Sequence, residues 1–173
     1  MYINGGNGLE SSLYFLTCAE MLFFYCDFEG FSCGANEFIV KEISILSNDG
    51  MQCFTYRVGS PNNCTYFPRD STFKYQYDRH HLAWEDGDYC FSDAMGDIRQ
   101  KVLGSVMYVK GEQKQRFLEK YFPYVSQLDM LPSFSKLNSC PTEWCEYRHG
   151  KNCARRKVHE LKYFVDNNKV LLH

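Results

Sequence analysis

Three stretches rich in β-branched and aromatic residues occupy the first third of the chain, and they constrain its fold more than any other feature. They cover residues 21–27, 37–46 and 52–58. The last two are joined by Asn48-Asp49-Gly50, a sequence typical of hairpin turns. Short apolar runs bounded by turn residues indicate strands. We therefore expect three antiparallel strands in this part of the chain.

The rest of the chain changes to helical periodicity. Apolar side chains recur at spacings of three and four between 86 and 103, at Phe91, Met95, Ile98 and Val102, which predicts an amphipathic helix. Further elements are expected in turn: a strand over 105–109, a helix over 111–121, a strand over 124–128, and a helix over 152–165 with Ala154, Val158, Leu161 and Phe164 on one face.

The connection over 59–79 contains Pro61 and Pro68 and shows no sustained period, so we expect a long irregular segment that crosses the surface as a flap. The predicted order is βββαβαβα. Such an order implies an α/β fold with a mixed sheet and helices packed on the sheet faces, and it suggests a ribonuclease H-like architecture. A length of 173 residues suits one domain, expected over 21–173 after a lead-in over 1–20.

Charge and cysteine content limit the class of protein. A formal net charge of −2 gives no global field toward nucleic acid or anionic membrane, so any nucleic-acid contact must be a local patch. The nine cysteines are odd in number and scattered, which favours a reducing compartment, cytoplasmic or nuclear. The longest apolar stretch, 13–26, is too short to span a bilayer, and we expect no membrane association.

Two carboxylates stand at the end of the first predicted strand. Asp27 and Glu29 lie two residues apart, so both side chains leave the same face and can converge on one divalent cation. Paired carboxylates with magnesium are the core of two-metal phosphodiester hydrolysis. The pattern alone is more typical of a solvated strand end than of a metal site.

A compact group of sulfur and imidazole side chains precedes the last helix. Cys145, His149 and Cys153 follow the spacing Cys-x3-His-x3-Cys, which suits tetrahedral zinc. The fourth ligand is then either Cys140 or a carboxylate from elsewhere in the fold.

Over roughly 21–166 the chain resembles the DEDDh-type 3′–5′ exonucleases. The run Cys26-Asp27-Phe28-Glu29-Gly30, followed by Ile39-Val40-Lys41-Glu42-Ile43-Ser44-Ile45, resembles their first motif and second strand. His81-Leu82-Ala83-Trp84 is similar to the short segment that precedes their first helix. The range 108–118 falls where their second motif stands.

Two zinc-bearing branches of that superfamily are more similar still, the Maelstrom domain of the piRNA pathway and the exonuclease domain of arenavirus nucleoproteins. Both hold zinc with a Glu-Cys-His-Cys set. The resemblance implies a structural zinc held by Glu42, Cys145, His149 and Cys153, with Glu42 preferred over Cys140 as the fourth ligand.

The departures from the family pattern concern the catalytic residues. Lys114 stands where the second-motif aspartate is expected, and the third-motif histidine and aspartate fall near Asn152 and Lys157. Asp27 and Glu29 alone remain, which predicts that two-ion hydrolysis fails. We expect the Lys114 ammonium to neutralise them in place of a metal ion. In the alternative, Lys114 faces solvent and an active site is completed by one of Asp88, Asp93, Asp97 or Asp129.

A local basic cluster, formed by Arg148, Lys151, Arg155, Arg156 and Lys157, begins the last helix. Such side chains bind phosphates, with nearby aromatic rings stacking on unpaired bases, although basic runs are often solvated helix faces. For Trp84 and the neighbouring His80-His81 we expect a packing role for the indole and solvent exposure for one imidazole.

The resemblance and its departures together predict a catalytically impaired, zinc-stabilised module that binds RNA or protein partners, in small-RNA or transposon silencing as the Maelstrom likeness implies. The rival hypothesis is an active 3′–5′ exonuclease on RNA or DNA that uses Mg²⁺ or Mn²⁺. A pure protein-interaction scaffold is the third. The sequence leaves the oligomeric state open.

Overall fold

The computed structural model describes residues 21–32, 38–59, 71–128 and 153–168. Within these ranges the order of elements is βββααβαβα. The strands are β1 (Phe23–Ser32), β2 (Phe38–Ser47), β3 (Cys53–Arg57), β4 (Val106–Val109) and β5 (Val125–Gln127). The helices are α1 (Ser71–His80), α2 (Phe91–Lys101), α3 (Glu112–Leu118) and α4 (Ala154–Asn168).

The strands form one mixed sheet in the order β3-β2-β1-β4-β5. β2 pairs antiparallel with both β1 and β3, whereas β4 pairs parallel with β1 and with β5. This confirms the predicted α/β class with an antiparallel meander followed by parallel strands. The hairpin turn is also present: the Ser47 amide donates to the Gln52 carbonyl at 2.9 Å, and Gly50 has a positive φ of 77°.

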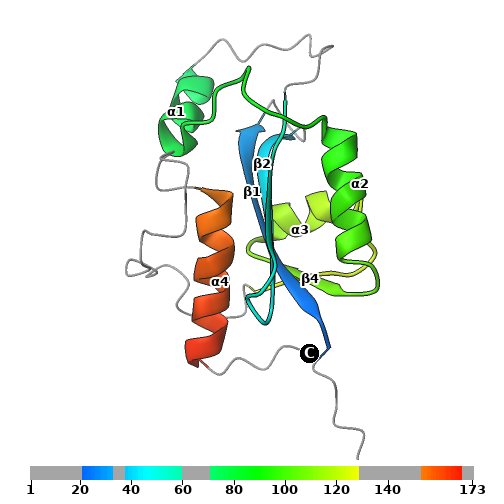
Figure 1. Ribbon diagram of the computed structural model, residues 1–173. Coiled ribbons are helices and arrows are strands. Elements are labelled where there is room, and N and C mark those ends of the chain that lie inside the picture. The colour runs from blue at the N-terminus through cyan, green and yellow to red at the C-terminus, as the bar shows by residue number, and fades with distance from the viewer. Residues whose placement is uncertain (1–20, 33–37, 60–70, 129–152, 169–173) are drawn as a thin grey trace, which may run out of the picture.

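Helices cover both faces of the sheet, with α4 on one side and α2 and α3 on the other (Figure 1). The α2 side holds the larger core, where Phe24, Cys26 and Phe28 pack with Met95 and Ile98. On the α4 side the buried residues include Tyr25, Leu46, Val158 and Leu161. The apolar stripes that the periodicity assigned to α2 and α4 are therefore confirmed as core-facing.

β1 differs from the prediction in a way that matters for the site. It begins two residues later than expected and continues to Ser32, so Asp27 and Glu29 lie inside the strand and not at its end. Glu29 pairs with Glu42, and Asp27 with Ser44, across the β1–β2 ladder. Tertiary pairing with β2 extends the strand beyond the carboxylates, which local sequence does not reveal.

Two helix predictions need correction. The connection over 59–79 is not wholly irregular, because α1 occupies its second half. That helix lacks an apolar stripe: of its described side chains only His80 is buried, so periodicity gave no signal. α2 begins at Phe91 and not near Asp86, because residues 85–90 form a loop that packs on the end of β3.

A bulge interrupts the β1–β2 ladder directly after Glu29. Glu29 pairs with Glu42 but Gly30 pairs with Val40, which leaves Lys41 as the extra residue. A Cβ on Gly30 would lie 1.9 Å from the Ile39 carbonyl oxygen, so only glycine permits this approach of the strands. Lys41 is buried, and its ammonium donates to the carbonyls of Trp84 at 2.7 Å and Asp86 at 2.5 Å.

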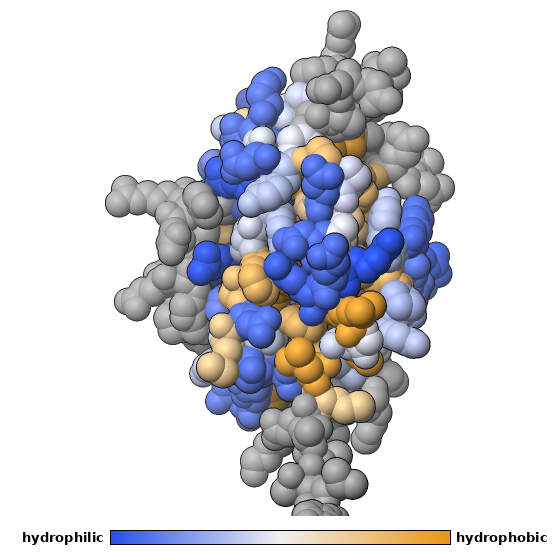
Figure 2. Space-filling view, turned by 45° about the vertical axis from the view of Figure 1, so that its right-hand side comes forward, coloured by the Kyte–Doolittle hydropathy of each residue, from blue (hydrophilic) through white to orange (hydrophobic). Residues whose placement is uncertain are grey.

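Hydrophilic residues cover much of the face seen in Figure 2, with hydrophobic patches gathered in its lower half. Large apolar side chains with more than four-fifths of their surface exposed are Met21, Met51 and Leu103. None of the helices in the described ranges has the length and apolar character needed to cross a membrane.

Candidate functional site

The candidate site is the α4 side of β1, where Asp27 and Glu29 lie. Side chains alternate along a strand, so Cys26 and Phe28 enter the α2-side core while the two carboxylates face α4. Asp27 is buried, with 3% of its surface exposed. A carboxylate at this depth must be paired with a cation or with hydrogen-bond donors.

Lys114, on α3, provides the first cation. Its ammonium forms an ion pair with the Asp27 carboxylate, donates to the Phe28 carbonyl at 2.7 Å, and lies 3.7 Å from Glu29 Oε1. Burial alone would lower the pKa of Lys114, but the Asp27 and Glu29 carboxylates outweigh it and hold that pKa above its ordinary value. The Lys114 ammonium therefore stays charged and neutralises the carboxylates, as expected from the sequence.

Lys157, on the first turns of α4, provides the second cation. Its ammonium forms an ion pair with Glu29 Oε1, across 128 positions of sequence. The resemblance to the exonucleases aligns Lys157 near their third-motif aspartate, whereas the basic run at the start of the last helix groups it with side chains expected to bind phosphates. The sign of its charge at that position was the signal that could have identified this contact.

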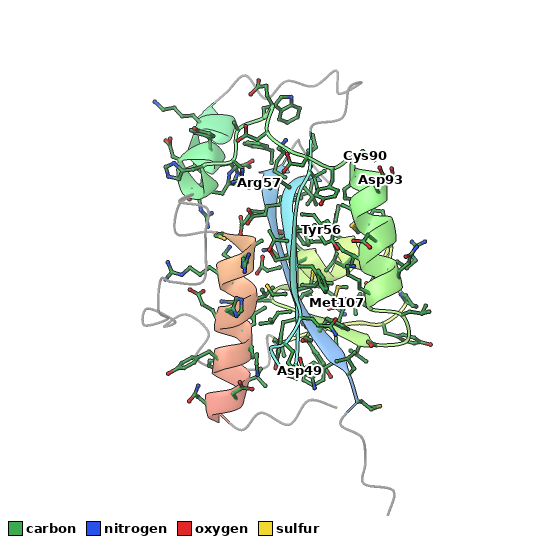
Figure 3. All side chains as sticks on the ribbon, in the orientation of Figure 1. Asp49, Tyr56, Arg57, Cys90, Asp93 and Met107 are labelled. Carbon is green, nitrogen blue, oxygen red and sulfur yellow. The ribbon has the colours of Figure 1, made fainter. Side chains whose placement is uncertain are left out.

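The result is a partly buried arrangement of two carboxylates and two ammonium groups with no net charge, in which Asp27 is the most deeply buried member. Among the described residues, no group of three or more His, Cys, Asp or Glu side chains is placed to hold a metal ion. Asp97, one alternative carboxylate, accepts from the Tyr56 hydroxyl at 2.5 Å and pairs with Lys101 on the α2 side. Asp93 lies in the first turn of α2, close to Cys90 (Figure 3). Asp88 lies in the loop that precedes α2, and Asp129 lies outside the described residues.

Glu42 lies beside this cluster, as the cross-strand neighbour of Glu29. It is completely buried, and its Oε1 accepts a hydrogen bond from the Ala154 amide at 2.7 Å. Cys153, the residue before Ala154, is buried with 1% of its surface exposed. Two of the four expected zinc ligands, Glu42 and Cys153, are thus brought to the same junction of β2 and α4 by the Glu42–Ala154 hydrogen bond. A buried carboxylate and a buried thiol are chemically suited to zinc. Cys140, Cys145 and His149 lie outside the described residues.

His80 is the buried member of the His80-His81 pair, with 2% of its surface exposed. Its Nδ1 accepts from the Leu82 amide at 3.1 Å, and its ring lies 4.9 Å from the Phe31 ring. Burial lowers the pKa of His80 to about 4, despite the opposing influence of the Gly30 carbonyl and the Glu42 carboxylate. The imidazole is therefore neutral at pH 7. Of the neighbouring residues, His81 is exposed and Trp84 packs 5.7 Å from Phe31, as expected.

Two of the described residues of the expected basic cluster, Arg156 and Lys157, form ion pairs within the protein. Arg156 Nε pairs with Glu160 at 2.8 Å, and Lys157 pairs with Glu29. Arg155 is half-buried on the same turn. Arg148 and Lys151 lie outside the described residues. The prediction that Lys157 faces a phosphate is therefore wrong, because its side chain points inward to Glu29.

No protein-family model matches this chain, and a search of curated proteins also returns no match.

Proposed function

We propose that this chain is a ribonuclease H-like, DEDDh exonuclease-like module that has lost metal-dependent hydrolysis and acts by binding RNA or protein partners. The setting we propose is small-RNA or transposon silencing, as the Maelstrom likeness implies. The strand order β3-β2-β1-β4-β5, with β2 antiparallel to both its neighbours, is compatible with a ribonuclease H-like fold.

The observation that carries the proposal is the neutralisation of both carboxylates by lysines. Two-ion hydrolysis needs several acidic ligands around two divalent cations. Here Asp27 pairs with Lys114, and Glu29 pairs with Lys157. A cation entering this site would have to displace two ammonium groups, and among the described residues it would meet no third ligand placed to hold it. The balance of charge favours the ion pairs over the metal.

A structural zinc completes the proposal, held by Glu42, Cys145, His149 and Cys153. The hydrogen bond from Ala154 to Glu42 brings β2 against the start of α4, which supports Glu42 over Cys140 as the fourth ligand. Bound zinc would supply folding energy directly by joining these two elements. Mg²⁺ or Mn²⁺ enters only under the rival hypothesis of an active exonuclease.

RNA is one of the two proposed partner classes beside proteins, on the basis of the family likeness and of the residues Arg148, Lys151, Arg155 and Arg156. Arginine and lysine contacts to phosphates make binding strongly dependent on salt. A protein partner would show no comparable dependence unless its own surface were highly charged.

The test is degradation of labelled single- and double-stranded RNA and DNA with Mg²⁺ or Mn²⁺, beside an Asp27→Ala/Glu29→Ala variant. We expect no cleavage by either protein, together with RNA binding that weakens as salt is raised. Cleavage that the variant lacks would establish the rival, an active exonuclease. If the protein neither cleaves nor binds RNA, the remaining hypothesis is a protein-interaction scaffold.

A second variant sharpens the test of the carrying observation. In Lys114→Asp/Lys157→Asp, four carboxylates replace two ion pairs, so we expect Mn²⁺ to bind more tightly than to the parent by calorimetry. A Lys101→Asp/Lys162→Asp variant changes the same net charge away from the cluster and should leave Mn²⁺ affinity unchanged. Equal Mn²⁺ affinity in all three proteins would contradict a lysine-neutralised cation site.

A further inference from the structure

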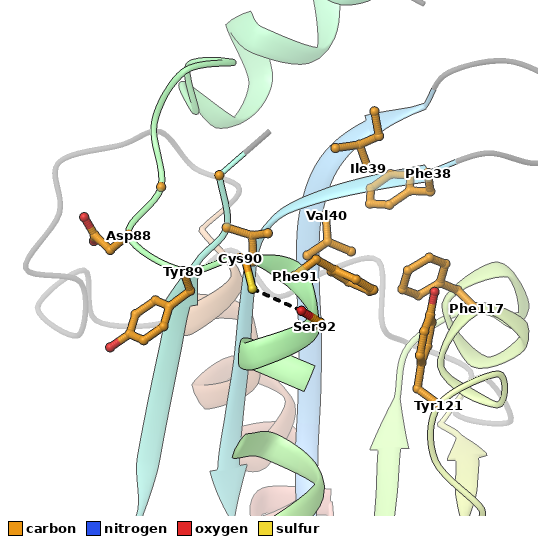
Figure 4. A pocket seen from close by; sticks show the side chains of 13 residues that line it. Phe38, Ile39, Val40, Asp88, Tyr89, Cys90, Phe91, Ser92, Phe117 and Tyr121 are labelled. Carbon is orange, nitrogen blue, oxygen red and sulfur yellow. Dashed lines mark hydrogen bonds between the residues drawn. The ribbon is translucent and has the colours of Figure 1, made fainter. Parts of the chain in front are cut away.

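A second concave site lies on the α2 side of the sheet, away from Asp27 and Glu29. Its volume is about 670 Å³, and Figure 4 shows aromatic side chains from β2, from the start of α2 and from α3 around it. The rings are Phe38, Tyr89, Phe91, Phe117 and Tyr121. Neither of the proposed sites for zinc and for the lost catalytic centre includes these residues.

The main chain builds one wall of this pocket. The Gly59 amide donates to the Tyr89 carbonyl at 2.9 Å, and Val58 forms a bridge with Tyr89. A Cβ on Gly87 would lie 2.1 Å from the Gly59 nitrogen, so glycine is required where the loop meets the end of β3. The buried Lys41 ammonium holds the same loop through the Trp84 and Asp86 carbonyls. These contacts preorganise the wall before any ligand arrives.

The pocket is suited to an aromatic group. Phe117 packs edge-on against Phe38 and Phe91, with centroids 6.1 and 6.4 Å apart. Aromatic pairs of this geometry extend readily to another ring, and the volume lies within the range of sites that hold small-molecule-sized groups. One aromatic side chain and its chain neighbours would fit the space.

The charge around the pocket distinguishes between two possible aromatic ligands, a base of a nucleic acid and an aromatic side chain of a peptide. The stretch Glu85–Asp93, which forms the wall and its continuation, carries four exposed carboxylates and no lysine or arginine: Glu85, Asp86, Asp88 and Asp93. Asp88 itself lines the pocket. Lys120 stands on the opposite side, 6.0 Å over the Phe117 ring. An acidic wall repels the phosphates of a nucleic acid and attracts the cationic side chains of a peptide.

We propose that this pocket docks a segment of a protein partner that packs one aromatic side chain against the exposed sides of Phe38, Phe91 and Phe117 and places lysine or arginine beside Asp88. The site rests on the proposed function only in that the chain acts by binding, and it specifies the partner as a basic, aromatic-bearing peptide segment. The aromatic anchor would supply most of the affinity, and the acidic wall would supply orientation and selectivity.

The test is titration of the isotopically labelled full chain, followed by amide NMR, with the peptide Gly-Arg-Lys-Trp-Arg-Lys-Gly. Two matched peptides replace the tryptophan with serine, or the four basic residues with glutamate. We expect shifts at the amides of Phe38, Cys90 and Phe117, and weakening by at least about tenfold with either matched peptide.

Variants of the protein place the interaction. Ser92 lines the pocket and is exposed, so Ser92→Trp should fill the space and abolish the shifts without disturbing the core. Asp88→Lys should weaken binding by about tenfold and reduce its salt dependence. Asp78→Lys on the exposed face of α1 makes the same charge change elsewhere and should bind like the parent.

Other outcomes would overturn the proposal. No pocket shifts up to about 1 mM peptide would exclude this partner chemistry. Shifts produced by a single-stranded RNA pentamer and not by the peptide would assign the pocket to a nucleobase, and pocket shifts that depend on protein concentration alone would assign it to a second copy of the chain. Nuclease and zinc measurements test the proposed function separately from peptide binding. The proposed function and the peptide-docking proposal can therefore fail independently.

Discussion

At the scale of single residues, the decisive feature is the sign of charge at positions 114 and 157. Each lysine lies against a carboxylate that a metal ion would otherwise have to neutralise. Removing one member of a buried ion pair leaves the other charge uncompensated, which costs more than the pair itself contributes. Replacing one member of an ion pair in this cluster should therefore lower the free energy of unfolding more than replacing both members together.

Lys114→Ala should lower the free energy of unfolding by about 3 kcal/mol, because Asp27 then stays buried without its partner. The double variant Lys114→Met/Asp27→Asn should recover much of that loss, since no buried charge remains on either residue. Denaturant unfolding with fluorescence detection measures both. The matched control is Arg116→Ala, whose i,i+4 partner Glu112 is exposed, and which should change stability by under about 0.5 kcal/mol.

The histidine of α4 gives a pH dependence. Burial, with Arg155 and Lys162 nearby, lowers the pKa of His159 below its usual value of 6.5. The unfolded chain therefore takes up a proton near pH 6.5 that the folded chain resists, and stability falls as pH drops through this range. His159→Gln should lose less unfolding free energy than the parent between pH 7 and pH 5. Parallel profiles of the two proteins would contradict a depressed pKa for His159.

At the scale of elements, the strands and the amphipathic helices could be predicted because burial leaves a periodic mark in the sequence. α2 and α4 show it clearly, through Ile98 and Val158 among others. α1 leaves no such mark, since its aromatic residues Phe73, Tyr75 and Tyr77 recur at a spacing of two and not at helical spacing. The sequence signal for this helix is Asp70-Ser71-Thr72, residues favoured at helix starts. The extension of β1 beyond Glu29 depends on pairing with β2, which no local pattern encodes.

The same limit applies to the site. The approach of Lys114 to Asp27 could be expected from its place in the family pattern, whereas the approach of Lys157 to Glu29 requires knowing how α4 lies on the sheet. Periodicity identifies which face of α4 is buried but not which strand residues meet its polar flank. Which of His80 and His81 is buried was left open for a related reason, because the burial of His80 follows from the position of α1 over β1.

Zinc removal is a prediction about the junction of β2 and α4. Chelation should lower the melting temperature by several degrees, since bound metal contributes to folding free energy. Glu42→Gln and Cys153→Ser should each abolish the metal content and the response to chelator, whereas Cys140→Ser should preserve both. Metal analysis of the purified proteins and thermal melts with and without chelator give the measurement. If Cys140→Ser loses the zinc and Glu42→Gln keeps it, the fourth ligand is the thiol.

At the scale of the whole molecule, a single sheet shared by two cores makes the halves depend on each other. Phe24 and Cys26 belong to the α2-side core while Tyr25, between them, belongs to the α4-side core. Because neighbouring residues of one strand serve both, neither face can lose its packing without disturbing the other.

We expect one cooperative unfolding transition, with coincident curves from far-ultraviolet circular dichroism and from tryptophan fluorescence. Trp84 lies in a small cluster with Phe31 near the end of β1, and the dichroism reports the whole chain. Two separated transitions would show that the region around Trp84 unfolds independently of the sheet. A Trp84→Phe variant identifies which tryptophan gives the signal.

The two lysine contacts on β1 also bear on how such a protein could change over generations. An acidic side chain at position 114 alone would set a second negative charge beside Asp27 with no cation to balance it, and an acidic side chain at position 157 alone would do the same beside Glu29. Each single substitution is therefore expected to be less fit than the parent, so both positions must change together before carboxylates can gather around a cation. Under the proposed function, the two lysines would act as a ratchet that makes the loss of hydrolysis hard to reverse.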